Sequence, residues 1–98
     1  MADKVAKRWL IDGKVQGVSF RWFIREAGER LDLVGTVQNL YDGKVEVKAC
    51  GAEASLEKLR AKLEKGPRMA RVDEVAEQPL TDEETKELEE REIFEILL

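Results

Sequence analysis

The stretch Gly13-Lys14-Val15-Gln16-Gly17-Val18-Ser19-Phe20-Arg21 joins an expected strand to an expected helix, and the rest of the chain is arranged around it. Glycine allows a backbone path with positive φ and lets main-chain N–H groups approach a ligand closely. The first N–H groups of a helix have no intrahelical partners and lie at the positive end of its dipole. An arginine at this junction adds a permanently charged, bidentate donor. The stretch therefore predicts a phosphate-binding loop, although loops with this glycine spacing also serve as plain connectors.

Length and composition indicate one domain. The chain has 98 residues, 43% of them hydrophobic, which is enough for one core and leaves no room for a second. It contains no histidine, which excludes nucleophile–histidine pairs and zinc-protease chemistry. Cys50 is the only cysteine, the N-terminus lacks the apolar run of a signal peptide, and no apolar run is long enough to span a membrane. We therefore expect a soluble cytoplasmic protein. A monomer is also expected, although the sequence does not identify the oligomeric state.

Charge is divided unevenly along the chain. Residues 73–95 carry eleven acidic side chains against Lys86 and Arg91, a net charge of −9. Residues 1–72 carry ten acidic and fifteen basic side chains, a net charge of +5, and include the loop. This division suits a small anionic substrate, although mixed charge runs are commonly just a solvated surface.

The segments on either side of the loop have clear periodicities. Residues 5–12 place Trp9 and Ile11 on one face and polar residues on the other, which predicts a half-buried strand. After the loop, apolar residues recur at spacings of three and four and predict a helix with one buried face, formed by Phe20, Phe23, Ile24, Ala27 and Leu31. Ser19 is the candidate N-cap, and its hydroxyl could satisfy a first-turn N–H or touch a ligand. We expect its backbone to matter more than its side chain.

A hairpin and a second helix follow. Residues 34–40 are rich in β-branched side chains and predict a strand. Asp42-Gly43 favours a tight turn into residues 45–49, where apolar and charged side chains alternate, so these strands should be antiparallel neighbours. The next helix should end at Gly66-Pro67. Its apolar face consists of Ala52, Leu56, Leu59 and Leu63.

Two further strands are expected near the C-terminus. Residues 69–76 predict a fourth strand with Val72 and Val75 inward, and their spacing of three requires a bulge or irregularity. Residues 94–98 alternate Phe94, Ile96 and Leu98 with other side chains and predict a short closing strand.

The acidic segment between them has a weaker pattern. Residues 81–90 are too polar for a core helix. Thr81 and Glu84 have capping-box spacing, which would allow one exposed turn. We expect an acidic connector here.

The order strand, helix, strand, strand, helix, strand indicates a ferredoxin-like split βαβ sandwich of the α+β class. Right-handed crossovers place both helices on one face of a mainly antiparallel sheet, whose core strands follow the spatial order 4-1-3-2. The opposite face should be more open. Asn39 and the loop should lie close together at one edge of this sheet.

Two segments resemble the signatures of the acylphosphatase family. Gly13 to Arg21 resembles the first signature, and Gly35-Thr36-Val37-Gln38-Asn39, followed by Asp42-Gly43-Lys44-Val45-Glu46-Val47 and Gly51, resembles the second. The similarity continues through Gly66-Pro67 and Ala70-Arg71-Val72 to Phe94-Glu95-Ile96, so it covers nearly the whole chain. Family members share the ferredoxin-like fold that the element order predicts.

The resemblance implies hydrolysis of an acyl phosphate to a carboxylate and inorganic phosphate, with no metal or organic cofactor. It implies that Arg21 binds the phosphate and that Asn39 positions the attacking water. The implied phosphate site is completed by the main-chain N–H groups of Gln16, Gly17, Val18, Ser19 and Phe20. A histidine base is unnecessary, because a carboxylate is a good leaving group and a phosphate oxygen can accept the water proton.

Four residues depart from the family pattern. Ser19 stands where glycine or an aromatic residue is common, Ile24 where a hydroxyl residue is common, and Thr36 where an aromatic residue is common. Asp32 replaces a frequent glycine and is expected to adopt the left-handed αL conformation. These changes bear on rate and local stability more than on reaction type.

Other readings of the same residues stay open. A non-catalytic module of this fold would use the loop to bind a phosphorylated ligand. An RNA-binding module is disfavoured by the lack of paired aromatics on the central strands and by the acidic end, and we expect neither nucleic acid nor membrane as a partner. Asn39 also fits a turn residue, Trp9 and Trp22 fit core and rim packing, and Cys50 fits a small strand-end residue rather than a nucleophile.

Overall fold

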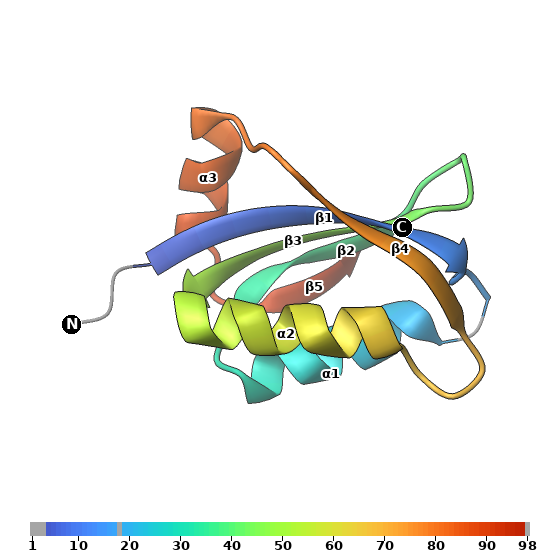
Figure 1. The fold of residues 1–98 in the computed structure, drawn as a ribbon. Coiled ribbons are helices and arrows are strands. Elements are labelled where there is room, and N and C mark those ends of the chain that lie inside the picture. The colour runs from blue at the N-terminus through green and yellow to red at the C-terminus, as the bar shows by residue number, and fades with distance from the viewer. Residues whose placement is uncertain (1–3, 18, 98) are drawn as a thin grey trace.

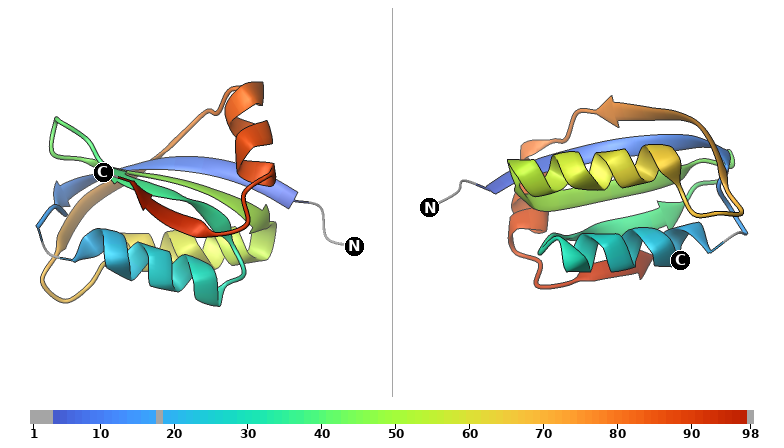
Figure 2. Two further views of the ribbon diagram at one scale, coloured as in Figure 1. Left: turned by 180° about the vertical axis from the view of Figure 1, so that it is seen from behind. Right: turned by 60° about the horizontal axis from the view of Figure 1, so that its bottom comes forward.

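The computed structural model describes residues 4–17 and 19–97. These residues form five strands and three helices (Figure 1). In chain order they are β1 (Lys4–Lys14), α1 (Phe20–Arg30), β2 (Val34–Asn39), β3 (Val45–Ala52), α2 (Glu53–Lys65), β4 (Arg71–Gln78), α3 (Asp82–Glu89) and β5 (Phe94–Leu97). Helices α1 and α2 lie side by side on one face of the sheet, as Figure 2 shows from two further directions.

The sheet has the strand order β4-β1-β3-β2-β5. Its first four positions confirm the predicted order 4-1-3-2, and the pairs β1–β3, β1–β4 and β2–β3 are antiparallel. Strand β5, which the sequence did not place, lies parallel to β2, with Gly35 opposite Phe94 and Val37 opposite Ile96. This pairing brings the C-terminal end of β5 beside the end of β2.

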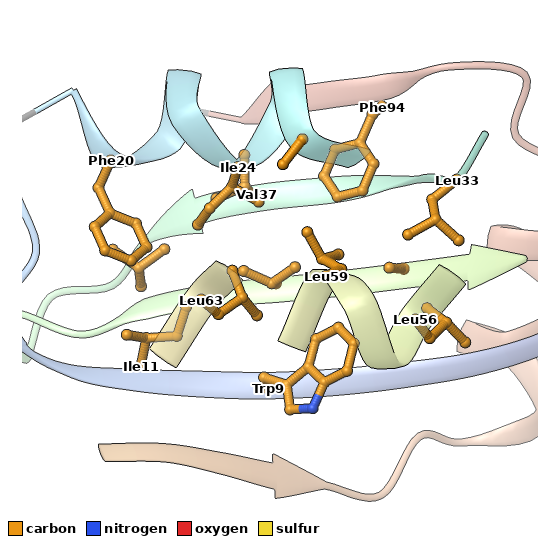
Figure 3. Close-up of a cluster of buried hydrophobic side chains, with 14 of the residues drawn as sticks. Trp9, Ile11, Phe20, Ile24, Leu33, Val37, Leu56, Leu59, Leu63 and Phe94 are labelled. Carbon is orange, nitrogen blue, oxygen red and sulfur yellow. The ribbon is translucent and has the colours of Figure 1, made fainter. Parts of the chain in front are cut away.

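The core fills the layer between the sheet and helices α1 and α2. Trp9 and Ile11 of β1 are fully buried, as the predicted alternation requires. Figure 3 shows the larger side chains gathered between the helices and the strands. Each fully buried aliphatic or aromatic side chain of this kind contributes roughly 1.5–3 kcal/mol. The core also contains the predicted helix residues Phe20, Ile24, Ala27, Leu56, Leu59 and Leu63, with Phe23 and Leu31 partly buried beside it.

The predicted irregularity of the fourth strand is confirmed where β4 meets β1. Asp12 pairs with Glu74 and Gly13 with Val72, so Asp73 is the extra residue on β4. Gly13 has φ 135°, and a Cβ there would collide with the main-chain oxygen of Arg71. Only glycine therefore fits at the point where β1 turns into the loop.

The expectation of an acidic connector was wrong, because Asp82–Glu89 form helix α3. The predicted capping box is confirmed: Thr81 Oγ1 accepts from the Glu84 N–H, and Glu84 Oε1 accepts from the Thr81 N–H. Glu84 also reaches Lys48 at 2.9 Å and Arg8 at 3.3 Å on the sheet. Helix α3 thus covers part of the face opposite α1 and α2 (Figure 1), which is less open than predicted.

Helix length and apolarity also bear on membrane insertion. None of the helices in the described residues is long and apolar enough to cross a bilayer.

Candidate active site

Three segments meet at one end of the sheet: the loop after β1, the end of β2 and the end of β5. Figures 1 and 2 show this loop, the β2–β3 turn and the C-terminal end of the chain at the same end of the molecule. A pocket of about 150 Å³ opens there. It is lined by Val15, Gly17, Ser19, Phe20, Arg21, Trp22, Asn39 and Ile96. The predicted proximity of Asn39 and the loop is confirmed.

The loop backbone is held between two buried side chains, Val15 and Phe20. Gly17 has φ 74°, a left-handed conformation that glycine adopts easily. This conformation lets a tight loop turn while its main-chain N–H groups stay free of internal partners. Within residues 4–17 and 19–97, no main-chain acceptor is bonded to the N–H groups of Gly17, Ser19 and Phe20. These donors are therefore available to an anion at the start of α1.

The predicted N-cap position of Ser19 is confirmed, but its hydroxyl does not form the cap, which was one of the two roles considered for it. Its backbone lies in the left-handed region, with φ 59° and ψ 26°, and its side chain makes no capping hydrogen bond to the described residues. A side-chain cap requires the extended backbone that N-cap residues usually adopt. Glycine adopts this left-handed conformation at less cost than serine. Ser19 therefore contributes to the site through its backbone.

The side chain of Gln16 has a role that the sequence did not reveal. Its Nε2 donates to the main-chain oxygens of Leu40 and Lys44, at 2.9 and 3.0 Å. These two residues are themselves joined across the β2–β3 turn by the Leu40 N–H and the Lys44 oxygen. Gln16 thus fastens the loop to the turn that follows Asn39. Nothing in the local sequence pattern indicates this long-range contact.

Arg21 is half-buried at the second position of α1 and is anchored from β5. Its Nη1 donates to the main-chain oxygen of Leu97 at 3.1 Å. No acidic residue lies in the first turn of α1, and no carboxylate of the described residues forms an ion pair with Arg21. A cation at this end of a helix is unfavourable unless an anion binds beside it. The remaining donors of the guanidinium fork can supply that contact.

Asn39 is the last residue of β2 and pairs with Val45. Its side-chain Oδ1 is buried and has no hydrogen-bond partner among the described residues. The turn itself is formed by other groups, since Asp42 Oδ1 accepts from the Lys44 N–H at 3.0 Å. Asn39 is therefore not needed as a turn residue. A buried acceptor without a donor is costly, and a water molecule is the ligand that would satisfy it.

A larger cavity of about 360 Å³ lies at the other end of the sheet, near the end of α1. Its lining residues are Glu29, Asp32, Leu33, Val34, Glu92, Ile93 and Phe94. Three of these side chains are carboxylates, which would repel an anion. The smaller pocket at the loop is therefore the better phosphate site despite its size.

The model of the acylphosphatase family matches residues 7–96. The chain belongs to the acylphosphatase family. It is 51% identical over 69 residues to an acylphosphatase of Koribacter versatilis, an alignment that covers 70% of this chain and 63% of that protein. It is 44% identical over 75 residues to an acylphosphatase of Vibrio vulnificus, covering 76% of this chain and 83% of that protein. The solved structure of an acylphosphatase from Coxiella burnetii superimposes with a TM-score of 0.85 at 34% identity, covering 97% of this chain and 94% of that one.

Two predictions remain, one for Val18 and one for Cys50. Val18, whose N–H belongs to the predicted phosphate loop, lies outside the described residues. Cys50 of this acylphosphatase is buried in β3, and burial, with a smaller contribution from Glu89, raises the pKa of its thiol. A buried thiol of raised pKa is a poor nucleophile. The described residues hold no cluster of three metal-ligating side chains.

Proposed function

We propose that this acylphosphatase binds the phosphoryl group of an acyl phosphate with Arg21 and with the main-chain N–H groups of residues 16–20. Asn39 holds the water that attacks phosphorus. The observation that carries this proposal is that Arg21 and Asn39 line one small pocket with the glycine loop. They come from segments that are eighteen positions apart in the sequence, at the start of α1 and the end of β2.

The phosphate half of the site works by charge and by preorganised donors. The Arg21 guanidinium is permanently charged, and Leu97 fixes its orientation before the substrate arrives. The loop N–H groups need not reorganise in the transition state, when charge on the phosphoryl oxygens is redistributed. Together they hold phosphorus in place and stabilise that charge.

The water half of the site supplies orientation. Asn39 Oδ1 accepts a hydrogen bond from the water and aims its oxygen at phosphorus. The new bond forms between the water oxygen and phosphorus, the bond between phosphorus and the bridging oxygen breaks, and the carboxylate leaves with the electron pair. Both water protons pass to phosphate oxygens, so that the products are a carboxylate and dihydrogen phosphate. No side-chain base is required.

Kinetics of single variants test the two roles separately. Wild-type protein should hydrolyse benzoyl phosphate in the presence of EDTA. Arg21→Ala should raise KM and the inhibition constant for inorganic phosphate and lower kcat/KM by about a hundredfold or more. Asn39→Ala should mainly lower kcat. Arg60→Ala on α2 and Gln78→Ala on β4 are matched controls outside the pocket and should keep wild-type rates. Wild-type rates in both site variants would refute the assignment.

The alternative is a non-catalytic module that binds a phosphorylated ligand in the same loop. It would show phosphate-induced NMR shifts at residues 16–21 without turnover of benzoyl phosphate. We further propose that residues 1–98 act as one domain and as a monomer, which size-exclusion chromatography tests. We also propose that hydrolysis needs no metal, which the assay with EDTA tests, and that the protein is cytoplasmic, which cell fractionation tests.

A further inference from the structure

The residues that line the pocket are of two chemical kinds. Gly17, Ser19, Arg21 and Asn39 contribute main-chain and side-chain polar groups. Val15, Phe20, Trp22 and Ile96 contribute apolar surface. Because the polar groups are sufficient for the phosphate and the water, the apolar residues that are not buried in the core are free to contact the rest of the substrate.

Trp22 is not required by the core. It is 55% exposed, whereas the buried face of α1 is formed by Phe20, Ile24, Ala27 and Gly28. A single exposed aromatic side chain is unremarkable by itself. Here, however, it directly follows Arg21 in the chain and lines the pocket together with Ile96, which packs partly against the core. Its exposed side chain is therefore available beside the pocket, and Trp22 also lines a second hollow with Phe23 and Lys62.

We infer that Trp22, supported by Ile96, binds the acyl group and gives this enzyme a preference for aromatic or bulky apolar acyl phosphates over acetyl phosphate. The inference rests on the proposed function, because Arg21 must hold the phosphate for the acyl group to reach Trp22. In an acyl phosphate only one bridging oxygen separates phosphorus from the acyl carbon. Because Arg21 and Trp22 line the same pocket, an acyl group on a phosphate held at Arg21 lies close to Trp22. The inference gives Trp22 a role in specificity, whereas the sequence favoured rim packing.

Aromatic pairing provides the selectivity. An aromatic acyl group can stack on the exposed indole, whereas a methyl group covers little of it. Pairs of this kind change an equilibrium constant by about two- to tenfold. The effect should appear in the ratio of affinities for two ligands that share a phosphonate and differ only in the acyl substituent.

The test uses two non-hydrolysable ligands, phenacylphosphonate and acetonylphosphonate, in which a methylene group replaces the bridging oxygen. Calorimetry would measure both dissociation constants, and that of inorganic phosphate, for the wild type, Trp22→Ala and Trp22→Phe. Ile93→Ala is the matched control, because Ile93 is similarly exposed, at 60%, but lines the cavity at the other end of the sheet. Trp22→Ala should reduce the phenacyl-to-acetonyl preference about two- to tenfold, Trp22→Phe should restore most of it, and Ile93→Ala should not change it.

The outcomes separate this inference from the proposed function. An unchanged preference in Trp22→Ala would overturn the inference, while loss of phosphate binding in Arg21→Ala would still support the phosphate site. Wild-type phosphate affinity in Arg21→Ala would overturn both, because nothing would then hold the acyl group beside Trp22.

Discussion

The side chain of Gln16 donates to the main-chain oxygen of Leu40 at 2.9 Å, which joins the phosphate loop to the residue after Asn39. The phosphate half and the water half of the proposed site come from segments after different strands. Their relative position determines whether the water approaches phosphorus in line with the bond that breaks. This hydrogen bond, with its companion to Lys44 at 3.0 Å, directly connects those halves. We therefore propose that the side chain of Gln16 is a positioning residue for the reaction, separate from the proposed role of its backbone N–H.

Gln16→Ala should lower kcat about ten- to a hundredfold, because small displacements of positioned groups have effects of this size. KM for benzoyl phosphate should change much less, since Arg21 is anchored independently by Leu97. Gln16→Glu should be worse than Gln16→Ala, because it would face two carbonyl oxygens with a carboxylate. Steady-state kinetics of both variants, with Gln78→Ala as the control, would measure the split. A fall in kcat accompanied by an equally large rise in KM would instead indicate general damage to the loop.

Gly28→Ala should destabilise the protein although alanine is the better helix former by about 1 kcal/mol. A Cβ at Gly28 would collide with the ring of Phe94, which is buried and cannot move aside. Overpacking of this kind costs about 1–3 kcal/mol in the free energy of unfolding. Urea unfolding would measure the loss, with Glu29→Ala on the exposed face of α1 as the control. Phe94→Leu should recover part of the loss when combined with Gly28→Ala, and a stabilised Gly28→Ala protein would show that β5 does not pack here.

Glu84 should make stability depend on acidic pH. The hydrogen bond from the Thr81 N–H, followed by that from Lys48, lowers the pKa of Glu84 from 4.5 to about 2. Because the folded-state pKa is the lower one, the charged carboxylate stabilises the fold above about pH 4.5, and this contribution is lost as the pH falls toward 2. Its side chain is 25% exposed, so solvent screening reduces the effect.

Glu84→Gln isolates the charge, because glutamine can still accept the capping hydrogen bond. The variant should have a lower Tm than the wild type at pH 7 and the same Tm near pH 2. Glu83→Gln, in the same turn of α3, is the control. A difference in Tm between wild type and Glu84→Gln that does not vary between pH 7 and pH 2 would rule out the ion pairs as its cause.

Much of the fold could be predicted because the spacing of apolar residues within each strand or helix is a local pattern. The alternation at Trp9 and Ile11 and the spacing of Leu56, Leu59 and Leu63 identify buried faces without knowledge of their partners. Helix α3 could not be predicted in the same way. Its only apolar residue is Leu88, and its attachment depends on Glu84 reaching Lys48 and Arg8 on strands far away in the sequence. Ion pairs between separate elements leave no periodic pattern in the sequence.

The same difference between local patterns and long-range contacts applies to the site. Arg21 and Asn39 were named because two local motifs resemble the family signatures, and the structure brings both to one pocket. The contacts that orient the site were not predictable, since Gln16 to Leu40 and Arg21 to Leu97 join segments through main-chain oxygens that any residue carries. The left-handed backbone of Ser19, with φ 59°, was not predicted, because serine usually caps with its hydroxyl from an extended backbone and glycine adopts this conformation more easily.

Hydrolysis of benzoyl phosphate in water enriched in oxygen-18 tests most directly whether phosphorus is the atom attacked. In the proposed mechanism Arg21 and the loop N–H groups hold the phosphoryl group and Asn39 positions the water, so the label should appear in inorganic phosphate and not in benzoate. Mass spectrometry of both products after a single turnover would locate it. Label in benzoate would mean that water attacks the acyl carbon, and would contradict the roles proposed for Arg21 and Asn39.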